Sequence, residues 1–446
     1  MTKPHIAVIG GGYSGMAAAV RITECGGEST VFEAARILGG RARRIDYLGR
    51  ELDNGQHILS GAYVELLRLI NLIGLADTVF KRIPLSLAMP PHFLLRAPRL
   101  PAPFHMAAAL LTAKGLTWSD RFKAIHMMWR LQKLDFKIDS ALTVAAMLRQ
   151  FGQSANLIRY LWQPLTVSAL NTPIESASAQ VFANVLRDAL AGKREASDLL
   201  LPTVNLTALF PAPAAIWVSQ RGGRVNLGQR VLSVTEHEQQ VILQIGDTHQ
   251  SFDAVIIAVG PHQRDDLLPS APLGNELTPP ATALSYQPIT TIYMGFDTPT
   301  ALPSAMIGQT QGVVHWFFDR RQLFGSLATT ELVVSAVISA SGPHDLLDAD
   351  TLAAKTLAEL RQFAPTLPQP TWQKVIREKF ATFACTPDAP RPSHLTTSRR
   401  IFLAGDDVAN PQRNYPATIE GTVRNGVAAA DAALKIIHSE PGRRYA

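Results

Sequence analysis

The sequence predicts an α/β fold in which a Rossmann-type nucleotide-binding domain is interleaved with a second domain of mixed sheet and helices. A short apolar run over residues 6–9 leads directly into a glycine-rich turn with the spacing G-x-G-x-x-G, formed by Gly10, Gly12 and Gly15. A second apolar run over residues 254–260 ends in glycine, and a third over residues 400–406 ends in Gly-Asp. Near-continuous apolar runs are typical of parallel strands buried on both faces. We therefore predict that all three belong to one central sheet.

The glycine-rich turn is typical of a site for the pyrophosphate of a dinucleotide. Gly10 permits the tight turn, Gly12 lets the backbone approach a pyrophosphate, and Gly15 lets the following helix pack closely on the strand. A helix that begins near Ser14 would point its N-terminus at the phosphates. Glu33 ends the next apolar run, about 20 residues on, where a carboxylate can hold ribose hydroxyls. This order of strand, turn, helix, strand and acid indicates nucleotide binding rather than an ordinary glycine turn.

The length of the chain indicates two intertwined domains, because 446 residues exceed one ordinary core. The nucleotide-binding domain is predicted to combine three segments, residues 1–75, 214–274 and 395–440. The two segments between them, residues 76–213 and 275–394, are predicted to form a substrate-binding domain around an apolar cavity.

The predicted substrate-binding domain begins with an apolar stretch that is rich in proline. Residues 84–103 hold six prolines among Leu, Met and Phe, and proline at this density stops helix and sheet alike. We therefore expect an irregular loop there, a candidate lid or membrane-contacting segment. Residues 105–195 look helical and amphipathic, and we interpret Trp118, Trp129 and Trp162 as core residues.

The composition favours contact with lipid over contact with nucleic acid. Charged residues make up 17% of the chain, against roughly 25% in an average protein, and the mean hydropathy is +0.08. A large apolar cavity, a membrane-facing patch or an alanine-rich core would each account for this balance. The net charge of +6 comes from scattered basic residues without an aromatic-interleaved basic stripe. No nucleic-acid partner is therefore expected, and the basic excess either favours an anionic membrane surface or has no role.

Cysteine usage and apolar run length predict the cellular compartment. Cys25 and Cys385 are too few for a disulfide scaffold or a multi-thiolate metal site, so we expect no metal and a reducing compartment. A strand that begins by residue 6 leaves no room for a signal peptide. No apolar run reaches the ~18 residues that a bilayer span needs. We expect a cytoplasmic protein that contacts the inner membrane, if at all, from its cytoplasmic face.

Four separated segments carry the signals of a single elongated cofactor site. They are the glycine-rich turn with Glu33, residues 39–41, residues 258–260, and residues 403–406 followed by 416–421. This set resembles the flavoprotein amine oxidase and carotenoid desaturase superfamily over nearly the whole chain. In that superfamily the nucleotide-binding domain is glutathione-reductase-like and the cofactor is FAD.

The resemblance implies which residues hold FAD. Those expected at the pyrophosphate and the adenosine ribose are Gly10, Gly12, Ser14, Gly15, Glu33, Gly40 and Arg41. Those expected at the adenine, the ribityl chain and the flavin ring are Val231, Gly405, Asp406, Thr418, Ile419, Gly55 and Gln56. Val231 would bind adenine through its backbone, and the guanidinium of Arg41 matches phosphate oxygens. The helix that starts at Thr418 would aim backbone N–H groups at the pyrimidine end, where they favour negative charge on reduced flavin.

A more specific resemblance rests on residues 52–63, LDNGQHILSGAY, and on residues 416–421, PATIEG. Within the superfamily they resemble the hydroxysqualene dehydroxylases of bacterial hopanoid synthesis. One departure is that residues 405–408 read Gly-Asp-Asp-Val where that branch usually has Gly-Asp-Trp-Thr. The resemblance implies reductive removal of an allylic hydroxyl group from hydroxysqualene, with reduced flavin as the donor and squalene and water as products.

This reaction needs an acid for the departing oxygen and a dry cavity around the allylic cation. His57 is the first candidate because imidazole titrates in the useful range and the resemblance places it near the flavin. The alternative interpretation of His57 is a structural hydrogen bond to the backbone. Asp53 is a second candidate, whereas His315 and Asp319 are not favoured.

Three other functions stay open at this point. An FAD-dependent carotenoid or phytoene-type desaturase would run the flavin in the opposite direction on a similar lipid, and an amine oxidase would favour a cage of paired aromatic rings. A prenyl-lipid carrier of the same architecture would lack flavin. The single dinucleotide fingerprint predicts that reducing equivalents come from a separate electron donor or from transient binding of a pyridine nucleotide. We also expect residues 84–103 and the helix over residues 104–111 to contact a membrane and admit the hydrophobic isoprenoid substrate, with Leu94 and Leu95 among the lipid contacts.

Overall fold

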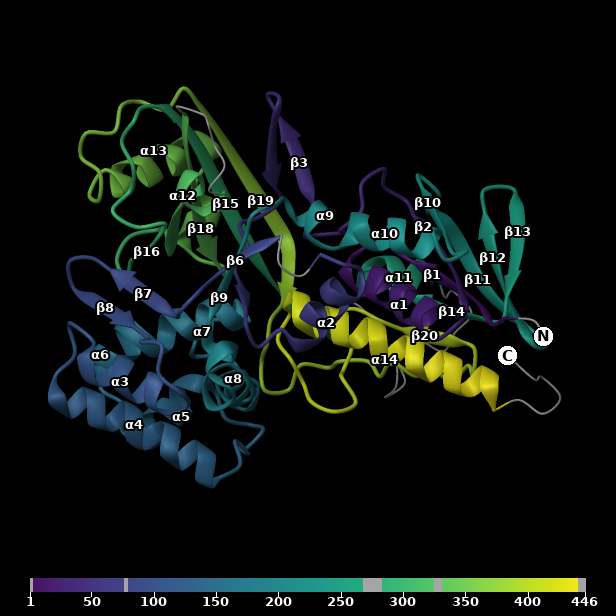
Figure 1. The fold of residues 1–446 in the computed structure, drawn as a ribbon, viewed down its shortest axis with the longest axis horizontal. Helices are drawn as coiled ribbons and strands as arrows, with labels where there is room; N and C mark the ends of the chain where they lie inside the picture. The colour runs from purple at the N-terminus through teal and green to yellow at the C-terminus, as the bar shows by residue number, and fades with distance from the viewer. Residues whose placement is uncertain (1–2, 76–78, 268–282, 325–330, 440–446) are drawn as a thin grey trace.

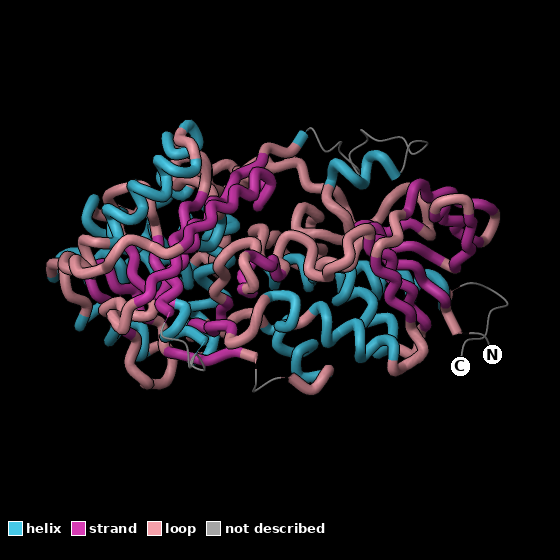
Figure 2. Tube along the Cα trace, turned by 90° about the horizontal axis from the view of Figure 1, so that it is seen from above, coloured by secondary structure: helices cyan, strands magenta, loops and turns pink. Residues whose placement is uncertain are grey.

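The computed structural model of this protein describes residues 3–75, 79–267, 283–324 and 331–439. Figures 1 and 2 show an elongated molecule with β-sheet and helices toward both ends.

A five-stranded parallel sheet forms the core of one half of the molecule. Its order is β10 (Arg224–Leu227), β2 (Glu28–Glu33), β1 (His5–Ile9), β14 (Ala254–Ile257) and β20 (Ile401–Leu403). Val8 at the centre of β1 lies beside Val31 on one side and Ile256 on the other. The three apolar runs of the sequence are therefore neighbouring strands of one sheet, which confirms the predicted α/β class.

Both faces of this sheet are covered, which explains why β1 and β14 at its centre are apolar on both sides. Ile6 and Val8 pack against helices on one face. These helices are α1 (Tyr13–Glu24), α10 (Pro211–Ser219) and α14 (Ile419–His438). Ala7 and Ile9 pack on the other face against an antiparallel sheet of β11 (Val231–His237), β12 (Gln240–Ile245) and β13 (Thr248–Phe252).

A second five-stranded sheet, antiparallel throughout, lies toward the other end (Figure 1). Its order is β16 (Met306–Gly308), β17 (Trp316–Asp319), β18 (Glu331–Ser339), β15 (Tyr286–Asp297) and β19 (Trp372–Phe383). Helix α13 (Ala349–Leu360) packs on one face, and α12 (Arg320–Phe324) follows β17.

Helices dominate residues 104–186, as the amphipathic pattern predicts. They are α3 (Phe104–Thr112), α4 (Trp118–Lys133), α5 (Val144–Gln150), α6 (Ala155–Leu157), α7 (Gln163–Leu170) and α8 (Ala179–Leu186). Shorter elements complete the described fold. They are β3 (Arg44–Tyr47), β4 (Arg50–Asp53), β5 (Leu59–Ser60), α2 (Val64–Leu72), β6 (Phe80–Ile83), β9 (Leu199–Pro202), α9 (Leu206–Leu209) and α11 (Pro261–Leu267).

The predicted irregular loop over residues 84–103 is wrong, because this stretch contains a β-hairpin. Strands β7 (Ser86–Met89) and β8 (Phe93–Arg96) pair antiparallel. The prolines lie before β7, in the turn and after β8, where they remove no hydrogen bond from the ladder. Leu95 is fully buried in the core of the helical half, so it is not a lipid contact.

The interpretation of Trp118 and Trp129 as core residues is also wrong, whereas Trp162 is buried as expected. Helix α4 turns Ala124, Met127 and Leu131 into the core, and the two tryptophans project from its other side. None of the described helices has the length and apolar character needed to cross a membrane. The described residues also contain no group of three or more His, Cys, Asp or Glu that could hold a metal ion.

Candidate functional site

The glycine-rich turn is shaped by two close backbone approaches that a side chain would block. Gly10 has φ of +108°, and a Cβ there would lie 2.7 Å from the carbonyl oxygen of Ala258 at the end of β14. A Cβ on Gly15 would lie 1.9 Å from the carbonyl oxygen of Gly10. The turn is also tied to β2, because the N–H of Gly10 donates to the carbonyl oxygen of Phe32 at 2.8 Å.

The N-terminus of α1 fits the phosphates of a dinucleotide. Gly12 is the N-cap residue and supplies no side-chain hydrogen bond to the helix N–H groups. The hydroxyl of Ser14 is buried and has no protein partner among the described residues. Gly12 also forms a β-bridge with Gly39. A Cβ on Gly12 would lie 3.8 Å from its nearest neighbour, the Cα of Gly40, so there is open space at this position. Free helix N–H groups, an unpartnered hydroxyl and open space together make an anion site.

Glu33 lies beside this turn at the end of β2. One carboxylate oxygen accepts a hydrogen bond from the N–H of Gly11 at 2.6 Å, and the other accepts from the N–H of Ala35 at 2.7 Å. Each carboxylate oxygen has a second lone pair, so both can still accept a hydroxyl. The structure thus brings together the predicted pyrophosphate and ribose residues.

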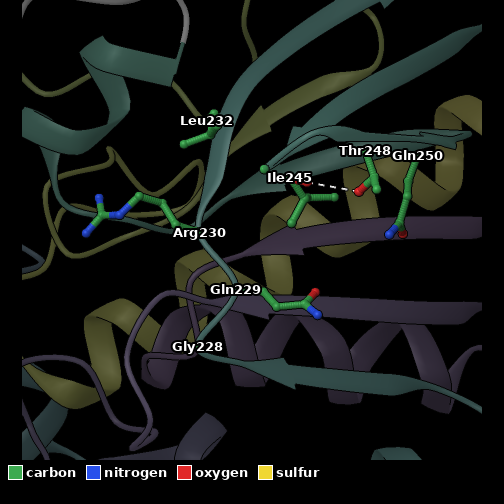
Figure 3. A pocket seen from close by; sticks show the side chains of 8 residues that line it. Gly228, Gln229, Arg230, Leu232, Ile245, Thr248 and Gln250 are labelled. Atoms are coloured by element: carbon green, nitrogen blue, oxygen red, sulfur yellow. Dashed lines mark hydrogen bonds between the residues drawn. The ribbon is translucent and has the colours of Figure 1, made fainter.

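A pocket of about 430 Å³ lies next to Val231, between the loop that enters β11 and the β12–β13 turn (Figure 3). Its lining residues are Gly228, Gln229, Arg230, Leu232, Ile245, Gly246, Thr248 and Gln250. Figure 3 shows the side chain of Arg230 extending away from Ile245 and Thr248. The N–H of Gln229 donates to the carbonyl oxygen of Glu33 at 2.9 Å, which fixes the pocket beside the end of β2.

Arg41 and Asp406 form an ion pair although 365 positions separate them in the sequence. Arg41 also donates to the carbonyl oxygens of Phe380 at 3.2 Å and Ala381 at 3.0 Å, at the end of β19. The pair joins the Gly39–Gly40 turn, the loop after β20 and the second sheet at one place.

The next residue, Asp407, pairs with an arginine that the sequence analysis missed. Its carboxylate accepts a hydrogen bond from Arg264 of α11 at 2.8 Å, and both side chains are almost fully buried. Burial raises the pKa of Asp407, and the charge of Arg264 opposes that rise. Asp407, which stands where the resembling family usually has Trp, therefore has an ion-pair partner within this chain.

Arg391, also missed, holds the loop that carries Asp406. Its guanidinium donates to the backbone oxygens of Asp406, Asp407, Val408 and Tyr415 at 2.6–3.2 Å. No local pattern in the sequence signals this role, because all four acceptors are backbone atoms.

The N-terminus of α14, which is predicted to face the pyrimidine end of the flavin, is held against the start of α2. Thr418 is its N-cap residue and accepts a hydrogen bond from the N–H of Gly421 at 3.1 Å, and Ile419 begins the helix. Glu420 is buried and accepts from the N–H groups of Glu65 and Leu66, both at 2.9 Å, at the start of α2. This carboxylate, which the sequence analysis did not identify, ties α14 to the chain that follows residues 52–63.

His57 is partly buried and its ring is held by the backbone. Nδ1 lies 2.8 Å from the carbonyl oxygen of Gly55, which can only accept, so Nδ1 carries the proton. Burial lowers the pKa of His57, so the ring is neutral near pH 7 and Nε2 has a free lone pair. The alternative interpretation, a hydrogen bond to the backbone, is therefore correct for Nδ1 and leaves Nε2 available.

Asp53 and Gln56 are tied to the second sheet by Arg320, a further residue that the sequence analysis missed. The side-chain oxygen of Gln56 accepts from Arg320 at 3.1 Å and from Ser335 at 3.2 Å. Arg320 also lies 3.8 Å from the carboxylate of Asp53, which accepts from the N–H of Leu206 at 2.8 Å. Burial raises the pKa of Asp53 despite the nearby Arg320.

Comparisons with known proteins find similarity over nearly the whole chain. The profile of the family described as flavin containing amine oxidoreductase matches residues 13–434. The chain is 30% identical to the hydroxysqualene dehydroxylase of Rhodopseudomonas palustris, over 96% of this chain and 97% of that protein. It is 28% identical to the hydroxysqualene dehydroxylase of Zymomonas mobilis, over 97% and 99% of the two chains.

Two more distant similarities bear on the alternatives and on the fold. A probable zeta-carotene desaturase of Synechococcus elongatus is 23% identical, over 97% of this chain and 98% of that protein. Among solved structures, an oxidoreductase from Methanosarcina mazei superposes with a TM-score of 0.74 at 15% identity. That match covers 96% of this chain and 100% of the other, so the two share a fold.

Proposed function

This chain belongs to the family of flavin-containing amine oxidoreductases, and from that premise we propose that it removes the allylic hydroxyl group of hydroxysqualene reductively, releasing squalene and water. It is an FAD-dependent oxidoreductase. The observation that carries the proposal is the full-length similarity to the hydroxysqualene dehydroxylase of Rhodopseudomonas palustris. That similarity includes the helical half as well as the parallel sheet, so it covers more than the cofactor site.

We propose that the residues predicted from the sequence hold FAD along one line through the molecule. The pyrophosphate would lie at the N-terminus of α1, where Ser14 has an unpartnered hydroxyl. Glu33 would accept the hydroxyls of the adenosine ribose, and the adenine would enter the pocket beside Val231. The ribityl chain would pass Arg41 and Asp406, and the N–H of Ile419 would face the pyrimidine end of the ring.

Reduced FAD, when bound, supplies the hydride that replaces the departing hydroxyl group. The protein has to supply a proton for that hydroxyl and keep water away from the allylic cation. We propose that Nε2 of His57 delivers the proton, because Nδ1 is held by Gly55 and Nε2 has no hydrogen-bond partner among the residues that the structure describes. A depressed pKa makes the protonated imidazole a strong donor but lowers its population near neutral pH.

The surroundings of His57 suit an apolar substrate. Ile58, the next residue, packs against the large apolar cluster of the helical half, which also includes Trp162, Phe182 and Phe383. Asp53 shares the electrostatic environment of His57 and has a raised pKa, so it is the second proton donor that we consider. Its carboxylate is held by Leu206 and Arg320, which restricts how far it can reach.

We also propose a hydrophobic isoprenoid substrate drawn from a membrane and a separate electron donor. A C30 hydrocarbon with one hydroxyl group partitions into a bilayer rather than into water. A single nucleotide fingerprint occurs in the sequence, which supports a reductant outside this chain.

The experiment that tests the proposed function is a product analysis with dithionite-reduced enzyme under anaerobic conditions. Hydroxysqualene, phytoene and simple amines are offered separately, and the oxidised enzyme is offered the same three compounds. We expect squalene from hydroxysqualene with reduced enzyme only. Desaturated products from phytoene with oxidised enzyme, without squalene formation, would instead favour the carotenoid desaturase alternative that the similarity to zeta-carotene desaturases suggests.

A further inference from the structure

Helix α4 exposes three large aromatic side chains along one side. Trp118 is 63% exposed, Phe122 is 62% exposed and Trp129 is 48% exposed. Their separations of four and seven residues place them on one helix face. The opposite side of α4 is buried core, formed by Ala124, Met127 and Leu131. We call the three aromatic residues the aromatic face of α4. Leaving such a face in water is costly, which marks it as an interaction surface.

The adjoining helix α3 also exposes large apolar side chains. Phe104 and Leu111, seven residues apart, are exposed on it, and α3 packs against α4. Figure 1 shows both helices at the edge of the molecule, at the end opposite to β1, β2 and β14. The surface is thus remote from the proposed cofactor site.

The exposed charges on helix α4 itself are all of one sign. Helix α4 carries four cations, Arg121, Lys123, Arg130 and Lys133, and a single carboxylate, Asp120. That carboxylate is buried in the capping box at the helix N-terminus, so it does not offset the cations at the surface. The guanidinium of Arg121 lies 4.5 Å from the ring centre of Trp118, and the ammonium of Lys133 lies 4.1 Å from that of Trp129.

We propose that the aromatic face of α4 docks this protein on an anionic lipid bilayer, an inference that rests on the proposed function for its link to a lipid substrate. Tryptophan rings beside lysine and arginine suit the interface between headgroups and acyl chains, where rings bury apolar area and cations meet lipid phosphates. A second copy of the chain fits this surface less well. A two-fold axis through it would bring the same cations together and repel.

The inner side of α4 connects the docking surface to the proposed site through apolar contacts. Met127 and Leu131 belong to the same apolar cluster that Ile58, beside His57, packs against. The docking surface and the neighbourhood of His57 therefore adjoin the same apolar core. This relationship predicts that docking and substrate delivery use the same half of the molecule.

Sedimentation of the FAD-loaded full chain with vesicles tests the proposal. Vesicles of phosphatidylcholine with phosphatidylglycerol are compared with vesicles of phosphatidylcholine alone, for the parent and for a Trp118→Ser, Phe122→Ser, Trp129→Ser variant. The matched control replaces three exposed apolar residues elsewhere, Leu48→Ser, Ile216→Ser and Leu346→Ser. We expect the aromatic variant to lose more than about tenfold in partitioning to anionic vesicles, and the control to bind like the parent.

Charge and activity measurements separate this proposal from its rivals. Lys123→Glu with Lys133→Glu should weaken binding to anionic vesicles and leave binding to neutral vesicles unchanged. Unchanged partitioning of the aromatic variant to vesicles overturns the proposal. The proposal is also overturned if the parent is a dimer, the aromatic variant is a monomer, and neither protein binds vesicles. Turnover of detergent-dispersed hydroxysqualene should be equal in parent and aromatic variant. If the parent lacks that turnover, the proposed function fails, whereas the vesicle result still decides the docking surface.

Discussion

Arg391 donates a hydrogen bond of 2.8 Å to the backbone oxygen of Asp406, and the same guanidinium holds three further backbone oxygens of the loop that ends at Tyr415. Asp406 in turn accepts a hydrogen bond from Arg41. The position of the carboxylate proposed beside the ribityl chain therefore depends on an arginine that reaches it only through the main chain. A lysine could not replace Arg391, because a single ammonium group cannot reach the four backbone oxygens that are spread around the planar guanidinium.

Replacing Arg391 by methionine should therefore weaken both the fold and FAD retention. Losing charged hydrogen bonds and leaving carbonyl groups unsatisfied should cost about 2–4 kcal/mol of unfolding free energy. Denaturant unfolding and the ratio of flavin to protein absorbance measure the two effects. Arg399→Met is the matched control, because Arg399 is exposed, and it should behave like the parent. Parent-like stability and flavin content in Arg391→Met would contradict the role of this guanidinium.

Replacing Glu33 by alanine should lower the affinity for FAD. A charged hydrogen bond to the ribose is worth about 1.5–3 kcal/mol, which is roughly 10- to 100-fold in the dissociation constant. Equilibrium dialysis of the apoprotein against FAD measures it. Glu236→Ala, on the exposed side of β11, is the control. Because Glu33 also accepts from the N–H of Gly11, a Glu33→Gln variant should keep part of the turn geometry and lose less than alanine. Equal affinity in parent and Glu33→Ala removes Glu33 from the site.

Residues whose role is local were the ones that the sequence could predict. The apolar runs that became β1, β14 and β20, and the glycines at the turn, carry their geometry in adjacent residues. The hairpin over β7 and β8 was missed because proline density was weighed without regard to where in a ladder each proline falls. Trp118 and Trp129 were misplaced because amphipathic spacing shows that a helix has two faces and does not show which one is covered.

Polar contacts between residues far apart in the sequence could not be predicted from sequence patterns. Glu420 binds backbone N–H groups more than 350 residues away in the sequence, and Arg391 binds four backbone carbonyl oxygens. The sequence shows the pairing of Glu420 with Arg424, four residues on, but it does not show these backbone contacts. His57 was placed near the site by resemblance, but its preferred tautomer depends on the carbonyl group of Gly55 and its pKa on burial. The roles of the FAD residues and the limits of the two domains stay predictions.

The proposed role of His57 predicts a rate that rises as pH falls. Because burial puts its pKa below the ordinary 6.5, the protonated donor becomes populated only in the acidic range. Single-turnover oxidation of the reduced enzyme by hydroxysqualene, followed by flavin absorbance against pH, measures this. His57→Gln should slow the step by about 10²–10⁴-fold and flatten the acid limb. His249→Gln, an exposed position on β13, should change neither.

The lowered pKa of His57 also predicts how the free energy of unfolding changes with pH. Below pH 6.5 the unfolded chain binds a proton at His57 before the folded chain does, so acidification favours unfolding. His57→Gln should therefore lose less unfolding free energy than the parent between pH 7 and the acidic range, as denaturant midpoints at each pH would show. An equal loss in both proteins would mean that His57 titrates alike in the folded and unfolded states.

The buried pair of Asp407 and Arg264 should show strong energetic coupling. The two groups are joined at 2.8 Å, and removing one leaves the other charged and desolvated. Asp407→Leu or Arg264→Met alone should therefore cost about 3–5 kcal/mol of unfolding free energy. The double variant should cost much less than the sum, because neither charge then remains in the core. Denaturant unfolding of the four proteins completes the cycle. If the cost of the double variant equals the sum of the two single costs, the pair does not act as a unit. The presence of Asp407 after Asp406 would then not be explained by its ion pair with Arg264 of α11.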